Sequence, residues 1–343
     1  MNVHMVLPEG VDDPGRPSGG NTYDRRICRE LVAMGWAVDV HVIPGDWPQT
    51  GGPAHAALAT VIDRIPDGEV VVVDGLVASA AADVLVPRAA RLRFVVLLHM
   101  PLGGDSEAAV VSCAASVVVT SGWTERLIHR TYGAGNGRVC VAEPGIDAAR
   151  PAPGTATGGE LLCVGAVIPS KGHDLLVDAL ERVADLHWHC VCVGTLERDR
   201  RYGEQLRHRI DEAGLAGRIR FTGVRTDSQL ERLYREADVL VLPSRAETYG
   251  MVLTEALARG LPVIASDVGG VPEAVGHVPG GVRPGILVRA DDAAAVTEAL
   301  TAWLGDARLR ADLRRAALER RSALRPWSAT AGDIALACKA AAA

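Results

Sequence analysis

The sequence has little lysine, no surplus of basic residues and no long hydrophobic run. Only Lys171 and Lys339 are lysines among its 343 residues, and the formal charge at pH 7 is −6. A protein that neutralises nucleic-acid phosphates needs a surplus of Lys and Arg, so we expect no nucleic-acid partner. No apolar run approaches the roughly 18–20 residues that span a bilayer, and we therefore expect no integral membrane segment.

A secretory signal and a disulfide framework are also missing. The opening apolar residues run at once into Pro8 and Glu9 and have no basic start, which predicts no secretory signal. The 7 cysteines are odd in number and form no C-x-x-C pair, which is typical of reduced thiols in a reducing compartment. From these absences we expect a cytoplasmic protein.

The sequence does contain a regular alternation of short apolar runs and longer helical stretches. Several runs are uninterrupted, such as VVVV at 70–73 and VLVL at 239–242, which is typical of strands buried on both faces of a parallel sheet. The expected strands are 3–7, 36–43, 69–74, 93–99, 116–120 and 138–142, followed by 161–165, 187–194, 218–222, 238–243, 262–265 and 286–288.

This strand–helix alternation predicts an α/β fold of two doubly wound, Rossmann-like domains. A stretch rich in Pro and Gly at 151–159 separates the two series of strands, and RPWS at 325–328 breaks an Arg/Ala-rich helix and begins a last short one. We expect a first domain at residues 1–150, a second at 151–325 and a C-terminal helix at 326–343.

One strand–loop–helix crossing carries the strongest functional signal. In the segment SRAETYGMVLTEALARG, Gly250 precedes a helix whose first turn contains Met251 and Val252. Free N–H groups and the positive end of the helix dipole favour a phosphate there, and Gly250 allows a ligand close to the backbone. Glu247 and Glu255 would lie roughly 12 Å apart along a continuous helix, so they can hold hydroxyls at opposite ends of one long ligand.

The segment around Glu247 resembles the Glu-x7-Glu motif of the group 1, or GT4, family of retaining glycosyltransferases. Further segments resemble that family in the same order along nearly the whole chain. The resemblance implies a GT-B fold of two facing Rossmann-like domains, with a C-terminal helix that crosses back to the N-terminal domain. The further segments are PSGG at 17–20, LHMP at 98–101, VVTSGW at 118–123, EPGID at 143–147, VGAVIPSKG at 164–172 and SDVGGVPE at 266–273.

The resemblance also implies a site for a nucleotide-sugar donor. Glu247 would hold hydroxyls of the transferred sugar and Glu255 those of the ribose, while Gly19 and Gly20 would bring backbone N–H groups onto the pyrophosphate. Lys171 would supply a mobile positive charge for the leaving diphosphate, a role that a metal ion plays elsewhere. The implied donor-binding residues are Gly19, Gly20, Gly165, Lys171, Val224, Arg225, Glu247, Gly250, Met251, Val252 and Glu255.

Three residues would act in catalysis: His99, Lys171 and Glu247. His99 ends an expected strand and, by resemblance, lines the acceptor side of the sugar. Val224 and Arg225 follow another strand and fall where the family places the nucleotide base.

The implied reaction moves a sugar from a nucleotide-diphosphate-sugar, with UDP preferred over GDP, to a small-molecule acceptor with retention of anomeric configuration. We expect front-face substitution in which the departing diphosphate takes the acceptor's proton, because no carboxylate is placed as a covalent nucleophile. The family needs no Asp-x-Asp motif, so we expect no metal and no cofactor beyond the nucleotide-sugar co-substrate. A homodimer is left open.

One departure from the family concerns the loop that contains Lys171. Ala166 stands where the family has an arginine, and a bidentate phosphate donor is therefore missing from its usual place. Arg245 is a candidate replacement by its position. Two alternatives stay open: a GT-B nucleotide-sugar 2-epimerase, which acts on the donor alone, and a catalytically silent GT-B partner subunit.

Neither a zinc site nor a dinucleotide-binding dehydrogenase is predicted by the sequence. HWHCVC at 187–192 has the residue types of a zinc cluster, but on a strand His189 and Cys190 point to opposite faces, whereas zinc needs converging ligands. A dinucleotide-binding dehydrogenase would have G-x-G-x-x-G after its first strand, and this sequence lacks that spacing.

Overall fold

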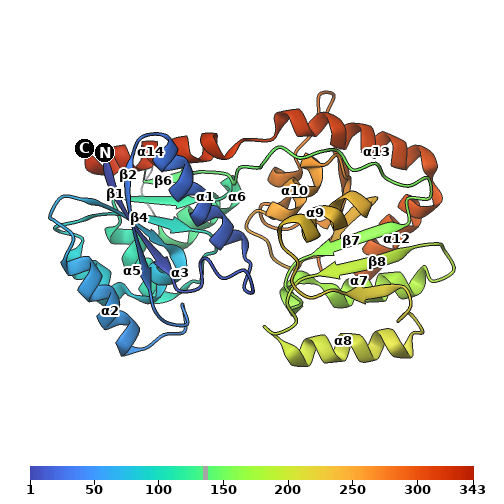
Figure 1. Ribbon diagram of the computed structural model, residues 1–343, viewed down its shortest axis with the longest axis horizontal. Coiled ribbons are helices and arrows are strands. Elements are labelled where there is room, and N and C mark those ends of the chain that lie inside the picture. Colours follow the sequence, from blue (N-terminus) through green and yellow to red (C-terminus); the bar gives the residue numbers. More distant parts are fainter. Residues whose placement is uncertain (134–137) are drawn as a thin grey trace. The chain divides into compact units, whose positions relative to one another are not determined.

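The computed structural model describes residues 1–133 and 138–343, and the chain divides into two compact units (Figure 1). Unit 1 comprises Met1–Gly145 and Arg325–Ala343, and unit 2 comprises Ile146–Leu324. Each unit contains one six-stranded sheet in which neighbouring strands pair in parallel. The two α/β domains expected from the alternating pattern are therefore present.

The sheet of unit 1 has the strand order β2-β1-β3-β4-β5-β6. Helix α1 packs with α14, and α3 packs with α5. The strands are β1 (Asn2–Pro8), β2 (Ala37–Ile43), β3 (Val70–Asp74), β4 (Arg93–Leu98), β5 (Ser116–Val119) and β6 (Val139–Val141). The helices are α1 (Gly19–Ala33), α2 (Gly52–Asp63), α3 (Gly75–Ala80), α4 (Ala82–Leu85), the 3-10 helix η1 (Val86–Arg88), α5 (Gly104–Cys113), α6 (Gly122–Tyr132) and α14 (Trp327–Ala342).

The sheet of unit 2 has the strand order β12-β11-β10-β7-β8-β9. The strands are β7 (Glu160–Val164), β8 (His189–Val193), β9 (Ile219–Phe221), β10 (Val239–Leu242), β11 (Val263–Ser266) and β12 (Gly285–Val288). The helices are η2 (Pro169–Lys171), α7 (His173–Arg182), α8 (Arg200–Glu212), α9 (Asp227–Glu236), α10 (Met251–Ala258), α11 (Val271–Val275), α12 (Ala293–Gly305), α13 (Ala307–Arg320) and η3 (Arg321–Ala323).

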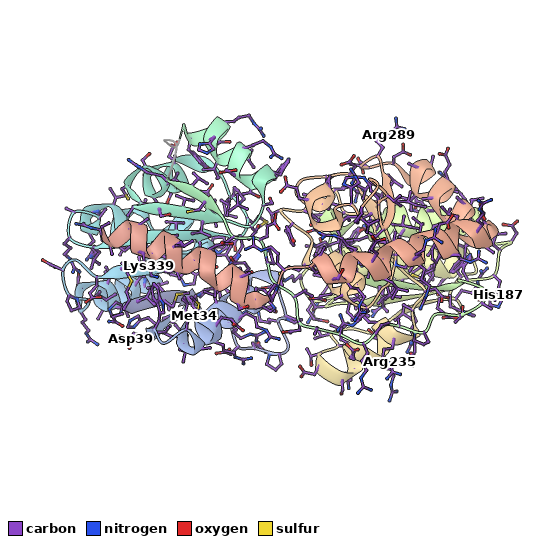
Figure 2. The ribbon with its side chains drawn as sticks, turned by 90° about the horizontal axis from the view of Figure 1, so that it is seen from above. Met34, Asp39, His187, Arg235, Arg289 and Lys339 are labelled. Atoms are coloured by element: carbon purple, nitrogen blue, oxygen red, sulfur yellow. The ribbon has the colours of Figure 1, made fainter. Side chains whose placement is uncertain are left out.

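The strands lie where the apolar runs predict them, and no end differs by more than two residues. All residues of β3 and β10 are buried, as expected for central strands covered on both faces. In the HWHCVC segment, His187 and His189 are exposed while Cys190 and Cys192 are buried, and Figure 2 shows His187 at the surface of unit 2. The interpretation of this segment as an ordinary strand is confirmed.

Each sheet has one point where the strand order reverses. In unit 1 this switch point lies between β1 and β3, and in unit 2 it lies between β7 and β10. Connections from two such neighbouring strands leave in opposite directions, so a crevice opens outside their carboxyl ends, and ligands of doubly wound sheets bind there. The loops after these strands are therefore where functional groups are expected to gather.

Helix α14 belongs to unit 1 and packs beside α1 (Figure 1). The Trp327 ring meets the Tyr23 ring edge-on with 5.6 Å between centroids, and the Thr330 hydroxyl donates to the Glu143 carbonyl at 2.8 Å. Gly145 leaves room for this contact, since a Cβ there would lie 2.4 Å from the Trp327 backbone. With 16 residues α14 is the longest described helix and not the short one expected after RPWS. Among the helices in residues 1–133 and 138–343, none has the length and apolar character that a membrane span needs.

The chain passes from unit 1 to unit 2 at Gly145, ahead of the Pro/Gly-rich stretch at 151–159. That stretch is held on unit 2 by hydrogen bonds. The Ala152 N–H donates to the Arg259 carbonyl at 2.9 Å, and the Asp238 carboxylate accepts from the Thr155 N–H at 2.5 Å and from the Thr155 hydroxyl at 2.7 Å. The Pro/Gly-rich stretch at 151–159 therefore belongs to unit 2, and the boundary between the units lies a few residues before it, after Gly145.

Candidate functional site

Two side chains meet at the switch point of unit 2. Lys171 follows β7 and Glu247 follows β10, and the Lys171 Nζ lies 2.5 Å from the Glu247 Oε1. The same oxygen accepts from the Ser244 hydroxyl at 2.9 Å. The Lys171 side chain is 26% exposed and that of Glu247 only 10%, so their attraction is screened less than that of a surface pair. The structure thus brings together two of the three residues predicted to be catalytic.

Two glycines allow the loops to approach this closely. Gly172 has a φ of 68°, and a Cβ on it would lie 2.0 Å from the Pro243 carbonyl oxygen. Gly269 has a φ of 56°, and a Cβ there would lie 1.7 Å from the Glu247 carbonyl oxygen, which also accepts from the Gly270 N–H at 3.1 Å. Side chains at either glycine would push the loops apart, so these positions fix where Lys171 and Glu247 stand.

The helix α10 begins four residues after Glu247. Its N-cap is Gly250, in the left-handed region with a φ of 94°, and the helix starts with Met251 and Val252. The first N–H groups of a helix have no partner within that helix and carry the positive end of its dipole. The predicted anion-binding elements therefore lie at the carboxyl end of β10, in the order that the sequence indicates.

Glu255 lies one turn into α10 and has a partner of its own. Its Oε2 accepts from the hydroxyl of the buried Tyr234 at 2.7 Å. Burial raises the pKa of Glu255, against lowering contributions from the Tyr234 hydrogen bond and the Arg259 charge. The Arg259 guanidinium covers the Tyr234 ring at 4.4 Å, so the carboxylate is held in a fixed orientation. Sequence reasoning did not find Tyr234, because it lies on α9 and nothing in its local pattern points to Glu255.

The remaining predicted donor-binding residues of unit 2 follow β7 and β9. A Cβ on Gly165 would lie 3.6 Å from the Lys171 side chain, so this glycine lies directly against the lysine stem. Val224 and Arg225 lie in the loop after β9, and the Arg225 Nη1 donates to the Val224 carbonyl at 2.8 Å. The Gly194 N–H joins the start of this loop by donating to the Gly223 carbonyl at 3.0 Å.

Arg245 does not take the place of the arginine missing at Ala166. Its Nη1 and Nη2 form a fork with the Asp174 carboxylate at 2.8 and 2.7 Å, and its Nε donates to Asp291 at 2.7 Å. Burial raises the pKa of Asp174, but hydrogen bonds from Arg245 and Tyr202 outweigh it and lower that pKa to about 2. The guanidinium is thus committed to protein carboxylates, and its role is to join the loop before Glu247 to α7.

In unit 1 the predicted residues gather after β1 and β4. Ser18 caps α1 by accepting from the Asn21 N–H at 3.0 Å, so Gly19 and Gly20 form the first turn of the helix. A Cβ on Gly20 would lie 3.1 Å from the His99 ring, so a side chain at this position would press on the ring. The structure therefore places the Gly-Gly turn against His99, the third predicted catalytic residue.

His99 has two acidic neighbours that sequence reasoning missed. Its Nε2 lies 2.8 Å from the Asp24 Oδ1 and 3.6 Å from the Asp74 Oδ2. Burial disfavours the imidazolium, but the charge and hydrogen bond of Asp24 and the charge of Asp74 outweigh this, and the pKa of His99 is raised. A signal for Asp74 was available, since it is an acidic residue at the end of an uninterrupted apolar strand. Asp24 has no such signal, because it is one of many charges on α1.

The family model described as glycosyl transferases group 1 matches residues 148–320. The D-inositol 3-phosphate glycosyltransferase of Jonesia denitrificans is 33% identical over an alignment of 249 residues that covers 66% of this chain and 57% of that protein. The lipopolysaccharide core biosynthesis mannosyltransferase LpsB of Rhizobium meliloti is 35% identical over 147 residues, 42% of this chain and 41% of that protein. The chain spans about half the length of the curated relatives it matches.

Solved structures share the fold over nearly the whole chain. The sucrose-phosphate synthase from Thermosynechococcus elongatus superposes with a TM-score of 0.78 at 23% identity and covers 97% of both chains. Anabaena HepE in complex with UDP and glucose superposes with a TM-score of 0.76 at 19% identity and covers 98% of both chains. These likenesses confirm the GT-B fold of two Rossmann-like domains that the resemblance implied. Since the family model spans half of the sequence, including the Lys171 and Glu247 loops, the chain belongs to the glycosyl transferases group 1 family.

Proposed function

We propose that this chain is a retaining glycosyltransferase that moves a sugar from a nucleotide-diphosphate-sugar to a small-molecule acceptor. The observation that carries the proposal is the Lys171–Glu247 pair at the switch point of unit 2, where Glu247 lies four residues before the first residue of α10. An ammonium group matches diphosphate charge, a carboxylate matches sugar hydroxyls, and helical N–H groups match phosphate oxygens. The ammonium group and the helical N–H groups thus suit the diphosphate of such a donor, and the carboxylate suits its sugar.

The pairing of Lys171 with Glu247 is compatible with donor binding. An ammonium group has three N–H donors, so it can keep its contact with the Glu247 Oε1 while it donates to a phosphate oxygen. Because Arg245 is committed to Asp174 and Asp291, Lys171 would be the side-chain cation for the diphosphate in this loop. The backbone N–H groups of Met251 and Val252 would supply the other donors.

In the proposed reaction the acceptor hydroxyl oxygen bonds to the anomeric carbon on the face from which the diphosphate leaves. The bond from that carbon to the phosphate oxygen breaks, and the proton of the acceptor passes to the departing diphosphate. Lys171 and the α10 N-terminus would stabilise the charge that grows on the leaving group, which lowers the barrier more than it strengthens ground-state binding. Configuration is retained because attack and departure use one face.

The donor is proposed to be a UDP-sugar rather than a GDP-sugar. Anabaena HepE, which shares the fold, has been solved in complex with UDP and glucose. Relatives are named for an inositol phosphate acceptor and for mannosyl transfer, so acceptor and sugar differ within the family. For this chain we propose a small hydroxylated acceptor.

Product analysis tests the proposed function. The chain is incubated with UDP-glucose, UDP-N-acetylglucosamine or GDP-mannose and a panel of sugars and cyclitols, and products are followed by mass spectrometry and proton NMR. We expect an acceptor to gain one glycosyl unit with the anomeric configuration of the donor, faster from a UDP donor. Conversion of the UDP-sugar without an acceptor would identify a 2-epimerase, and nucleotide binding without transfer or hydrolysis a silent partner subunit. Either result contradicts the proposal.

Substitution Lys171→Ala tests the role of the ammonium group. We expect kcat to fall by about 10²–10³-fold, while the Kd for UDP changes by less than about tenfold, because leaving-group charge is larger in the transition state than in the bound donor. The matched control is Lys339→Ala, which changes the only other lysine, an exposed residue on α14 (Figure 2). Equal losses in kcat and UDP affinity for Lys171→Ala would assign this residue to binding alone.

Metal independence is tested by chelation. We propose that Lys171 and the helix N-terminus take the part of a divalent cation, so the transfer rate in excess EDTA should equal the rate without it. The measurement compares initial rates at saturating donor with and without EDTA. A loss of turnover that added Mn²⁺ restores would show that a metal takes part.

A further inference from the structure

Three titratable side chains form a closed cluster at the switch point of unit 1. Asp24 comes from α1, Asp74 ends β3, and His99 follows β4. The side chains of Asp24 and Asp74 are 1% and 3% exposed, and that of His99 is 16% exposed. One polar atom from each lies within 4.8 Å of the other two. Two carboxyl groups and one imidazole are thus buried together where the fold directs a ligand.

The hydrogen bonds within the cluster leave one carboxylate oxygen without a donor. The Asp24 Oδ1 accepts from the His99 Nε2 at 2.8 Å, and the Asp74 Oδ1 accepts from the Leu76 N–H at 2.8 Å as the N-cap of α3. The Asp24 Oδ2 is buried without a hydrogen-bond partner among the described residues. A buried carboxylate oxygen without a donor is costly, and a protonated carboxyl beside it would supply one.

Asp74 is the neighbour that can supply this proton. Burial raises the pKa of Asp74 to about 7, and the nearby Asp24 charge acts in the same direction, while His99 opposes it. Two buried carboxyls this close do not both ionise readily, and one shared proton removes the repulsion. If Asp74 is protonated and its O–H faces Asp24, the Asp24 Oδ2 gains a hydrogen-bond donor. With His99 protonated on both nitrogens, the cluster then carries one positive and one negative charge.

The His99 Nδ1 is the ring nitrogen through which this cluster can contact a ligand. Within residues 1–133 and 138–343 it has no hydrogen-bond partner, and it is not among the fully buried polar atoms that lack one; the His99 side chain as a whole is 16% exposed. The Nε2–H···Oδ1 bond to Asp24 fixes the orientation of the ring, and Gly20 and Tyr23 confine it from α1. When the imidazole is protonated, Nδ1–H is therefore a fixed donor that points away from the acids.

We propose that Asp24, with Asp74, is a positioning residue for the transfer reaction: the two acids keep His99 a cation and hold its Nδ1–H toward the sugar or the acceptor. This inference rests on the proposed function. Its chemical consequence is that the group facing His99 is a hydrogen-bond acceptor, such as a hydroxyl or ring oxygen. His99 then stabilises a developing partial charge as a donor, while the diphosphate takes the proton of the acceptor.

The other titratable groups near His99 do not alter the proposed protonation of its ring. Tyr23 on α1 donates its hydroxyl to the Ala142 carbonyl at 2.9 Å, and burial raises its pKa well above the usual value, so it stays neutral. From the C-terminal segment, Arg325 and Asp333 form an ion pair at 2.5 Å, and their opposite charges act on Tyr23 from outside the cluster. Cys28 on α1 has its pKa raised to about 12 by burial and by Asp24, and it too stays neutral.

The variants Asp24→Asn and Asp74→Asn test the proposal, because it predicts a different pH profile for each of them. Asn at 74 can still cap α3 through its Oδ1 and donate to Asp24, as a protonated Asp would, so we expect a pH profile of kcat/KM close to that of the unmodified chain between pH 6 and 7. Asn at 24 keeps the hydrogen bond to Nε2 but removes the negative charge closest to it. The imidazolium is present below the pKa of His99 and lost above it, so the basic limb of the profile should move to lower pH.

The expected loss for Asp24→Asn is about tenfold or more in kcat/KM at pH 8.5 and less than about threefold at pH 6. The matched control is Asp39→Asn, an exposed acid on β2 of the same unit, which should leave the profile unchanged (Figure 2). A loss that is equal at all pH values would mean that Asp24 is merely structural and would overturn the proposal.

A second measurement does not depend on activity. The NMR titration of His99 in the unmodified chain should give a pKa above 6.5, and the Asp24→Asn variant should lower it more than Asp74→Asn does. A titration below 6.5 in the unmodified chain overturns the proposal even if Asp24→Asn fails to fold. Binding of Zn²⁺ at micromolar concentration that Asp24→Asn abolishes would also overturn it. If His99 titrates as expected but no sugar is transferred, the proposed function fails and the proton network stands.

Discussion

Parallel strands end at one edge of their sheet, and this constraint places the ammonium of Lys171 beside the carboxylate of Glu247. The two residues are 76 positions apart, yet β7 and β10 are neighbours, and the loops that follow them dock on each other. Gly172 permits that docking, because a Cβ there would meet the Pro243 carbonyl oxygen, and Gly269 lets the loop after β11 lie against Glu247 in the same way. The strand order thus determines where the proposed donor site lies, and the residues in the loops determine its chemistry.

Unit 1 uses the same topology for a different chemistry. Its switch point gathers an imidazole and two carboxyls in place of one ammonium and one carboxylate. The lysine in unit 2 is suited to a diphosphate because it is a compact and mobile charge. In the proposed arrangement the histidine in unit 1 would suit a sugar oxygen, because its hydrogen bond to Asp24 fixes its orientation.

Much of this arrangement can be predicted from the sequence, and what cannot has a physical reason. Uninterrupted apolar runs locate the strands, and Lys171, Glu247 and Gly250 belong to local motifs that a reader of the sequence can find. The partners of those residues have no local signature: Tyr234 reaches Glu255 across 21 positions and Asp24 reaches His99 across 75. Arg245 shows the opposite error, since its position indicated a phosphate ligand while Asp174 and Asp291 already bind it.

The central claim is that one ammonium group and the start of α10 receive the diphosphate of a nucleotide-sugar. A crystal structure of the chain with UDP bound tests it most directly. The account predicts a phosphate oxygen within hydrogen-bond distance of the Lys171 Nζ, another at the N–H groups of Met251 and Val252, and the ribose hydroxyls at Glu255. A nucleotide bound in unit 2 away from residues 247–255, with Lys171 untouched, would contradict it.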